Sequence, residues 1–117
     1  MIQIQLPASK SISNRLLIMQ ALSKTNFKIQ NLSKADDTVV LKEAIDSNLD
    51  IVDVGVAGTA FRFLTAFYAI QSNEVILKGD ARMNERPIGA LVDALVELGA
   101  EITYLDKTGF PPIRINA

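Results

Sequence analysis

The chain has 117 residues, of which 49% are hydrophobic and 21% are charged, a composition that fits one folded domain and excludes a disordered segment. Twelve Lys and Arg residues stand against 13 Asp and Glu residues, and the formal net charge of −1 gives no general reason to expect nucleic acid as a partner. The chain contains neither Cys nor His, which excludes disulfides, thiolate nucleophiles, catalytic triads with His and most transition-metal sites.

The first half of the chain alternates predicted strands and helices. Residues 2–6 alternate apolar and polar side chains, which is typical of a strand with one buried face. Apolar residues at helical spacing predict helices over 13–23 and 36–45, and Asp36 and Asp37 suit the positive N-terminal end of the second helix. Two more strands are predicted over 27–32 and 51–54.

The second half begins with a tight glycine-containing loop, 55–59, in which Thr59 is the expected N-cap of the next helix. That helix is predicted over 60–71 and is apolar on more than one side, so we expect it to be buried. A strand over 74–78 and a polar loop over 81–85 lead to an amphipathic helix over 88–98, with Pro87 at its first position and Gly99 as its left-handed cap. Strands over 101–105 and 112–115, joined by a turn, follow.

The order of these elements indicates an internal repeat. The tripeptide at 15–17 (RLL) precedes its counterpart at 62–64 (RFL) by 47 positions, and Ile29 precedes Ile76 by the same interval. Alternating helices and strands predict an α/β sandwich in which helices pack on one face of each sheet.

Positive charge is concentrated where helices are predicted to begin. Five of the 12 basic residues lie there: Lys10, Arg15, Arg62, Arg82 and Arg86. Cations at a helix N-terminus oppose the helix dipole, at a cost of a few tenths to about 1 kcal/mol each at exposed sites. Nearby carboxylates such as Glu85 or Asp80 would offset this cost, and so would a bound phosphate or carboxylate, which helix N-termini favour.

The sequence lacks membrane and targeting signals. No apolar run approaches the roughly 18 residues that a membrane span needs, and residues 1–10 lack the continuous apolar core of a signal peptide. We therefore expect a cytoplasmic protein without a membrane partner, whose chemistry rests on Lys, Arg, Asp, Glu, Ser and Thr side chains.

Four blocks of sequence stand out in combination: 6–15 (LPASKSISNR), Asp36-Asp37, 57–62 (AGTAFR) and 82–88 (RMNERPI). In this order they resemble the N-terminal substrate motif, the start of the second helix, the Asn-Ala-Gly-Thr-Ala-x-Arg block and the Arg-Met-x-Glu-Arg-Pro-Ile block of the EPSP synthase family, the 3-phosphoshikimate 1-carboxyvinyltransferases. The resemblance runs the length of the chain.

The resemblance implies a transferase of the shikimate pathway, which leads to chorismate and the aromatic amino acids. Such an enzyme transfers the enolpyruvyl group of phosphoenolpyruvate to the 5-hydroxyl of shikimate 3-phosphate and releases phosphate, with no metal and no organic cofactor. By motif, Lys10 touches both substrates, Ser11 and Arg15 hold shikimate 3-phosphate, and Gly58 and Arg86 hold phosphoenolpyruvate. These groups would neutralise and align two anions that otherwise repel.

Length is the main difference from this family, whose members are several times longer. They have two lobes built from repeated βαβαββ units, with helices packed against mixed sheets and the active site between the lobes. We therefore expect residues 1–117 to be the N-terminal portion of such an enzyme, a partial lobe of about two units, 1–55 and 56–117. The second lobe is then a missing partner, and the family's acid and base carboxylates lie beyond this segment, so we expect no turnover from the chain alone.

Three local features depart from the family's pattern. Val56 stands where the family usually has Asn, and Phe63 stands where it often has Pro. The segment between Asp37 and Gly55 is also shorter than in many relatives. These differences concern the geometry of the loop before the third predicted helix.

Three alternatives stay open at this point. The enolpyruvyl transferase that acts on UDP-N-acetylglucosamine shares the fold, but its N-terminal motif runs Ser-Lys-Asn-Ala and it usually carries a loop Cys. A non-catalytic module that binds anions or a partner protein is the second alternative. The third is a structural domain whose Arg residues pair with Asp and Glu, and whose stability would then respond to neither salt nor phosphate compounds.

Overall fold

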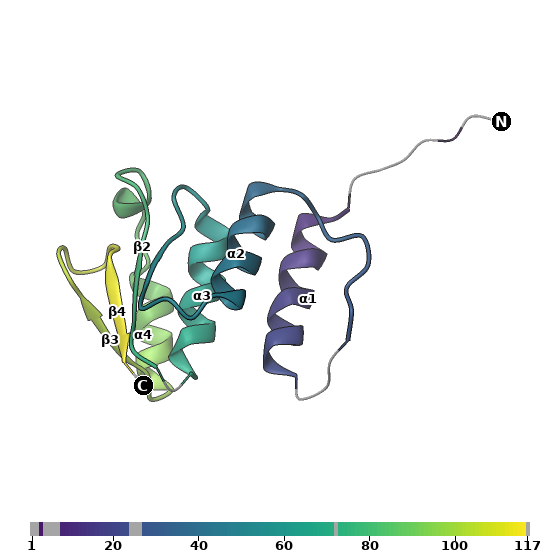
Figure 1. The fold of residues 1–117 in the computed structure, drawn as a ribbon. Helices are drawn as coiled ribbons and strands as arrows, with labels where there is room; N and C mark the ends of the chain where they lie inside the picture. The colour runs from purple at the N-terminus through teal and green to yellow at the C-terminus, as the bar shows by residue number, and fades with distance from the viewer. Residues whose placement is uncertain (1–2, 4–7, 24–26, 72, 117) are drawn as a thin grey trace.

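The computed structural model describes residues 3, 8–23, 27–71 and 73–116, which form a mixed α/β structure (Figure 1). In chain order the elements are α1 (Lys10–Leu22), α2 (Asp36–Asp46), β1 (Ile51–Asp53), α3 (Gly58–Ala69), β2 (Val75–Lys78), the 3-10 turn η1 (Met83–Glu85), α4 (Gly89–Glu97), β3 (Glu101–Tyr104) and β4 (Ile113–Asn116). The predicted helices are thus all present, with ends that differ by up to three residues.

The described strands form one mixed sheet in the order β1-β2-β4-β3. β1 and β2 are parallel, and the other two pairs are antiparallel. One row of the register places Val52, Leu77, Ile113 and Tyr104 side by side, and the first three of these are at most 5% exposed. Residues of one parity therefore face the core, as alternation along a strand requires.

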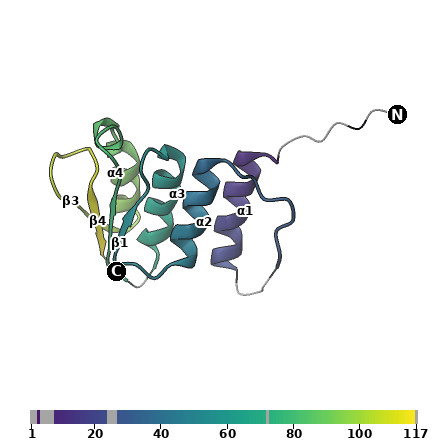
Figure 2. The same ribbon diagram turned by 45° about the horizontal axis from the view of Figure 1, so that its top comes forward.

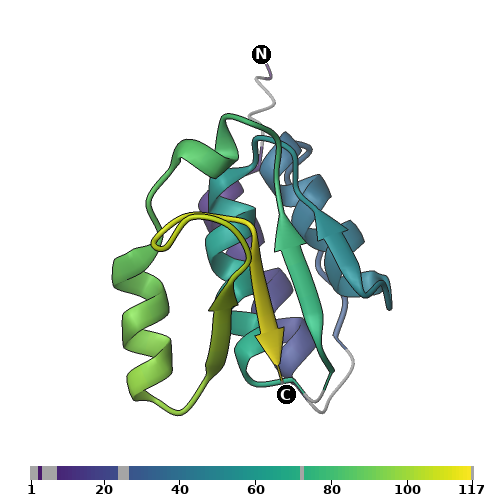
Figure 3. The same ribbon diagram turned by 90° about the vertical axis from the view of Figure 1, so that its left-hand side faces the viewer.

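All four helices lie on one side of this sheet. Figure 3 shows the sheet in front, with α3 behind it and α4 beside β3. α2 packs on α3 and α1 packs on α2, so the helices continue away from the sheet in layers (Figures 1 and 2). Helices on one face of a mixed sheet confirm the fold class expected from the sequence.

The core sits between the sheet and α3. Phe61 and Leu64 of α3 are fully buried, as are Leu77 and Ile113 of the strands that α3 covers. Leu41 carries the core into α2. The loop after β1 leads directly into α3, and Asp80 N–H in the loop after β2 donates to the Gly55 carbonyl at 3.0 Å, so both loops lie near the N-terminal end of α3.

The strand predicted over 27–32 is wrong. This segment pairs with no strand among the residues that the structure describes, and Asn31 has a φ of 58°, a left-handed conformation that interrupts an extended run. Instead it packs against α1, where the Gln20 side chain donates to the Phe27 carbonyl at 2.6 Å. The strand predicted over 2–6 lies outside the described residues.

Three boundaries have identifiable causes. α1 begins at Lys10, three residues before its predicted start, because the Ser9 hydroxyl accepts from Ile12 N–H at 3.2 Å and caps the helix. α4 begins at Gly89, so the prediction of Pro87 as its first residue is wrong; the Ile88 N–H donates to the Gly109 carbonyl at 2.9 Å instead. Gly99 follows α4 with a φ of 106°, which confirms the left-handed cap.

β1 completes the sheet formed by the second half of the chain. Sequence analysis placed residues 51–54 in the first of two units, 1–55, whereas β1 pairs with β2 in the same sheet as β3 and β4. Residues 51–116 therefore follow the order β-α-β-α-β-β. The division into two units stays a prediction.

Candidate functional site

The first part of the candidate site is the N-terminal turn of α1. Lys10 and Ser11 are its first two residues, and within the described part of the chain their backbone N–H groups have no acceptor. Arg15, one turn later, donates to the Ser11 hydroxyl oxygen. Lys10, Ser11 and Arg15 thus form one exposed, cationic cluster around unpaired N–H donors, which is the arrangement that favours an anion.

The second part is the N-terminal turn of α3. Its N-cap is Ala57, which has no side-chain oxygen, and the prediction of Thr59 as N-cap is therefore wrong. A capping side chain would accept a hydrogen bond from Ala60 N–H; here that N–H donates instead to Asp37 Oδ1 of α2, at 3.2 Å. Among the described residues the Gly58 and Thr59 N–H groups have no acceptor.

Arg86 lies directly against this turn. A Cβ added to Gly58 would clash with Nη1 of the Arg86 guanidinium, so only a glycine leaves that side chain its place. Gly58, Arg62 and Arg86 line a small cleft together with Phe61, Met83 and Ile88. The structure therefore brings the predicted pair of Gly58 and Arg86 together.

A second close approach lies in the loop that leads to Arg86. A Cβ on Gly79 would lie 2.5 Å from Met83 Cβ and 2.6 Å from the Gly55 carbonyl oxygen, so the loops after β1 and β2 touch at this glycine. The Asp80 N–H donates to that carbonyl at 3.0 Å. The Asp80 carboxylate also accepts from Met83 N–H at 3.0 Å, which fixes the start of η1.

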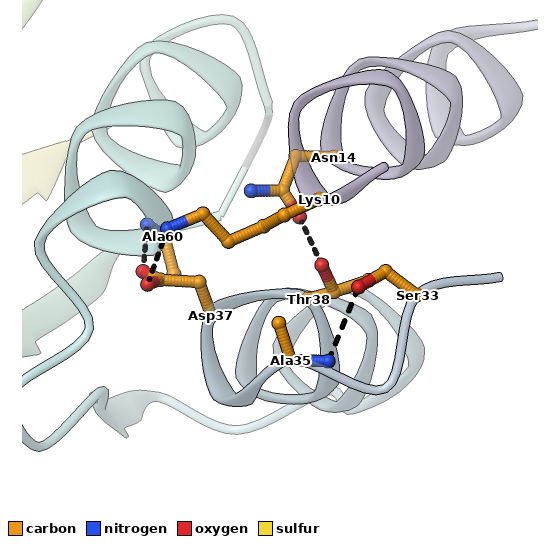
Figure 4. Close-up of polar contacts among 7 residues, drawn as sticks. All are labelled: Lys10, Asn14, Ser33, Ala35, Asp37, Thr38 and Ala60. Atoms are coloured by element: carbon orange, nitrogen blue, oxygen red, sulfur yellow. Dashed lines mark hydrogen bonds and ion pairs between the residues drawn. The ribbon is translucent and has the colours of Figure 1, made fainter. Parts of the chain in front are cut away.

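The two parts meet through Asp37 (Figure 4). Its Oδ2 lies 3.4 Å from Nζ of Lys10, while its Oδ1 accepts from α3 as described above. Lys10 therefore lies between the start of its own helix and the start of α3. A group in that position reaches the N-terminal turns of both helices.

Most of the cations at helix starts have no protein counter-charge. Of the five, Lys10 pairs with Asp37, whereas the structure shows no carboxylate within 4.0 Å of the other four over residues 8–23, 27–71 and 73–116: Arg15, Arg62, Arg82 and Arg86. The structural-domain alternative required such pairs. Unpaired guanidinium groups beside free N–H donors favour a bound anion instead.

The described residues hold no group of three or more His, Cys, Asp or Glu side chains arranged to ligate a metal. No helix among them is long and apolar enough to cross a membrane. Burial raises the pKa of Tyr68, and burial together with the charge of Asp93 raises the pKa of Tyr104.

Comparison with known proteins identifies the family. The family model described as EPSP synthase (3-phosphoshikimate 1-carboxyvinyltransferase) matches residues 2–47 and 39–117, which together span nearly the whole chain. The chain belongs to the EPSP synthase family.

Relatives support this membership. The 3-phosphoshikimate 1-carboxyvinyltransferase of Bacteroides fragilis is 52% identical over 113 residues, which cover 97% of this chain and 28% of that protein. The protein of the same name from Cellvibrio japonicus is 43% identical over 138 aligned positions, which cover 97% of this chain and 32% of that protein. The chain thus spans about a third or less of the length of these relatives.

A solved structure has the same fold. EPSP synthase from Acinetobacter baumannii superimposes with a TM-score of 0.87 at 20% sequence identity, over 97% of this chain and 31% of that one. This confirms the EPSP synthase-like fold of a partial chain. None of the relatives named here is a UDP-N-acetylglucosamine enolpyruvyl transferase, so that alternative is not favoured.

Two EPSP synthase positions that sequence analysis noted are now placed. Val56 is 55% exposed in the turn before α3, while Phe63 is half-buried on α3. Two contributions were missed: Arg62, which lines the cleft of Gly58 and Arg86, and Asp37. The clustering of Arg62 with other basic helix starts was a signal for the first. Asp37 belonged to one of the four family-like blocks, but sequence analysis assigned it only to the start of its own helix.

Proposed function

We propose that this chain forms the substrate-anion half of an enzyme that transfers the enolpyruvyl group of phosphoenolpyruvate to the 5-hydroxyl of shikimate 3-phosphate and releases phosphate. The observation that carries the proposal is the pairing of two cationic helix starts, α1 and α3, with Lys10 between them. The family membership supplies the substrates. Both substrates are anions of the kind that such turns bind.

Each site residue has a role that its surroundings support. Ser11 and Arg15 touch each other and hold the phosphate of shikimate 3-phosphate, with Arg15 supplying the charge. Gly58 lets the α3 backbone approach phosphoenolpyruvate, and Arg86, which lies against Gly58, pairs with that anion. Lys10 contacts both substrates and reduces the repulsion between them.

We expect this chain to bind substrates without turning them over. It spans 28% of the length of its Bacteroides fragilis relative, and family members place the active site between two lobes. We therefore expect the 117 residues to bind both anions weakly and to release no phosphate. The rest of the enzyme is the partner that would complete the site.

The test is an amide NMR titration of the chain with shikimate 3-phosphate at millimolar concentration. We expect saturating shifts that concentrate at Lys10, Ser11 and Arg15, and no such shifts with shikimate, which lacks the phosphate. A second titration with phosphoenolpyruvate is expected to shift Gly58, Thr59 and Arg86.

Matched variants control for net charge. Arg15→Ala and Lys28→Ala each remove one positive charge, but Lys28 is exposed in the segment beside the C-terminal part of α1. Arg15→Ala should abolish saturation by shikimate 3-phosphate, whereas Lys28→Ala should leave it within about two-fold, as for any screened surface charge. If both variants lose affinity for shikimate 3-phosphate equally, or if shikimate causes the same shifts as shikimate 3-phosphate, the binding is non-specific and the proposal is contradicted.

A further inference from the structure

One carboxylate connects the two halves of the candidate site, and its two oxygens face different helices. Asp37 is the second residue of α2. Oδ1 accepts from Ala60 N–H in α3 at 3.2 Å, and Oδ2 lies 3.4 Å from Lys10 Nζ in α1. An acid that served only the N-terminus of its own helix would need neither contact.

The backbone that carries Asp37 is fixed on α1 by buried hydrogen bonds (Figure 4). The next residue, Thr38, donates its hydroxyl to Asn14 Oδ1 at 2.8 Å, and both side chains are fully buried. Just before α2, Ser33 N–H donates to the Ser13 hydroxyl at 2.9 Å. The start of α2 is therefore held in place, and the carboxylate has a defined position from which to contact α1 and α3.

We propose that Asp37 is a positioning residue that holds the Lys10 ammonium beside the start of α3. There Lys10 faces the Ser11–Arg15 pair on one side and the Gly58–Arg86 pair on the other. A lysine side chain has a long flexible stem, and 48% of this one is exposed, so without a partner its charge would spread over many positions. This inference rests on the proposed function and adds a residue to it.

If Asp37 positions Lys10, its removal should weaken anion binding, whereas simple electrostatics predicts that its removal strengthens binding. A negative charge beside an anion site lowers affinity, so its loss should strengthen anion binding. Asp36 supplies the control, because it precedes Asp37 in the same helical turn, is exposed, and forms no hydrogen bond or ion pair with other described residues. Asp36→Asn removes the same charge without touching Lys10.

The first measurement needs no ligand. In the wild-type chain with 13C-labelled lysine, we expect the two Hε protons of Lys10 to have separate NMR shifts, because the ion pair restricts the side chain. Asp37→Asn keeps an oxygen for Ala60 N–H but loses the charge, so it should merge these two shifts and leave the Ala60 amide shift nearly unchanged. Asp37→Glu should restore part of the separation, and Asp36→Asn should leave it intact.

The second measurement is titration of the same four proteins with phosphoenolpyruvate. Relative to Asp36→Asn, Asp37→Asn should bind about two- to five-fold more weakly, the range expected for the loss of one partly exposed ion pair. Equal or tighter binding by Asp37→Asn would overturn the positioning role and leave Asp37 as a cap for α3. Merged Hε shifts in the wild-type chain would overturn it too.

The two proposals fail in different ways. If the wild-type chain binds neither substrate, the proposed function is contradicted, and the Lys10 shifts still decide whether Asp37 restricts that side chain. If the wild-type chain binds and all four proteins bind alike, the proposed function stands and the role of Asp37 is refuted.

Discussion

Gly79 is the residue at which the loops after β1 and β2 approach most closely, and Gly79→Ala should destabilise the protein. The new Cβ would lie 2.5 Å from Cβ and Cγ of Met83 and 2.6 Å from the Gly55 carbonyl oxygen. Ordinary carbon–carbon contacts are about 3.5–4.0 Å, so each neighbour must move by about 1 Å. Met83 is only 2% exposed, and the clashing atoms are its Cβ and Cγ, which cannot swing aside as the tip of a flexible side chain would.

The expected cost follows from these contacts. Overpacking of this kind costs about 1–3 kcal/mol, and loss of the hydrogen bond from Asp80 N–H to the Gly55 carbonyl would add about 1 kcal/mol. The lower entropy of the unfolded chain offsets about 0.4–1 kcal/mol. We therefore expect the free energy of unfolding to fall by about 1–3 kcal/mol, and the urea midpoint to fall by about 1 M.

Gly89→Ala is the matched control in the urea experiment. Gly89 is the first residue of α4, and the atoms nearest to its added Cβ lie 3.9 and 4.0 Å away. This substitution should leave the urea midpoint unchanged or raise it slightly, by about 0.4–1 kcal/mol in free energy. If Gly79→Ala unfolds at the same urea concentration as wild type or Gly89→Ala, the close approach of the two loops does not exist in solution.

Two further predictions concern buried polar groups. Thr38→Val removes the hydroxyl that donates to Asn14, leaving the buried Asn14 Oδ1 without its donor, and should lower the free energy of unfolding by about 1–3 kcal/mol; an unchanged urea midpoint would contradict this. Burial raises the pKa of Tyr68 above its ordinary value of 10.0, so Tyr68 contributes stability that is fully present below about pH 10 and is lost as the pH rises through the higher, folded-state pKa. The thermal unfolding midpoint of the wild-type protein should therefore fall as the pH rises above about 10, and the midpoint of Tyr68→Phe should fall less over the same interval. Parallel pH profiles for the two proteins would refute the role of Tyr68.

The helices were predictable because their signals are local. Apolar spacing predicted α2 and α4, two acids marked the start of α2, and Gly99 marked the end of α4. The hairpin of β3 and β4 was also predicted, since the two strands are joined by a turn rich in turn-forming residues. Each of these elements needs little information from outside its own segment.

The caps and one strand could not be predicted, because distant residues decide them. Thr59 is the best capping residue near the start of α3, yet Asp37 accepts the hydrogen bond from Ala60 N–H, 23 residues later, that a cap would accept. The alternation over 27–32 suits a strand, but a strand exists only where a partner pairs with it. Tertiary contacts thus override local preference at both places.

The candidate site likewise combines a contact that is predictable from local sequence with one that depends on tertiary packing. The contact between Ser11 and Arg15 follows from their spacing on one helix, four residues apart. The approach of Lys10 to the start of α3 depends on how α1, α2 and α3 pack, and no motif in the sequence encodes it. For this reason sequence analysis found the site residues but missed Asp37.

The distance of each helix from the sheet also affects how stably each half of the proposed site is folded. α1 packs mainly on α2, at the far end of the helical layers, and buries only Ser13, Asn14 and Leu17, whereas α3 buries five residues between α2 and the sheet. Segments with few buried contacts open at lower free energy than the global unfolding of the protein. Native-state hydrogen exchange should therefore show α1 opening as a separate unit, in excursions that displace Lys10, Ser11 and Arg15 and leave Gly58 and Arg86 in place.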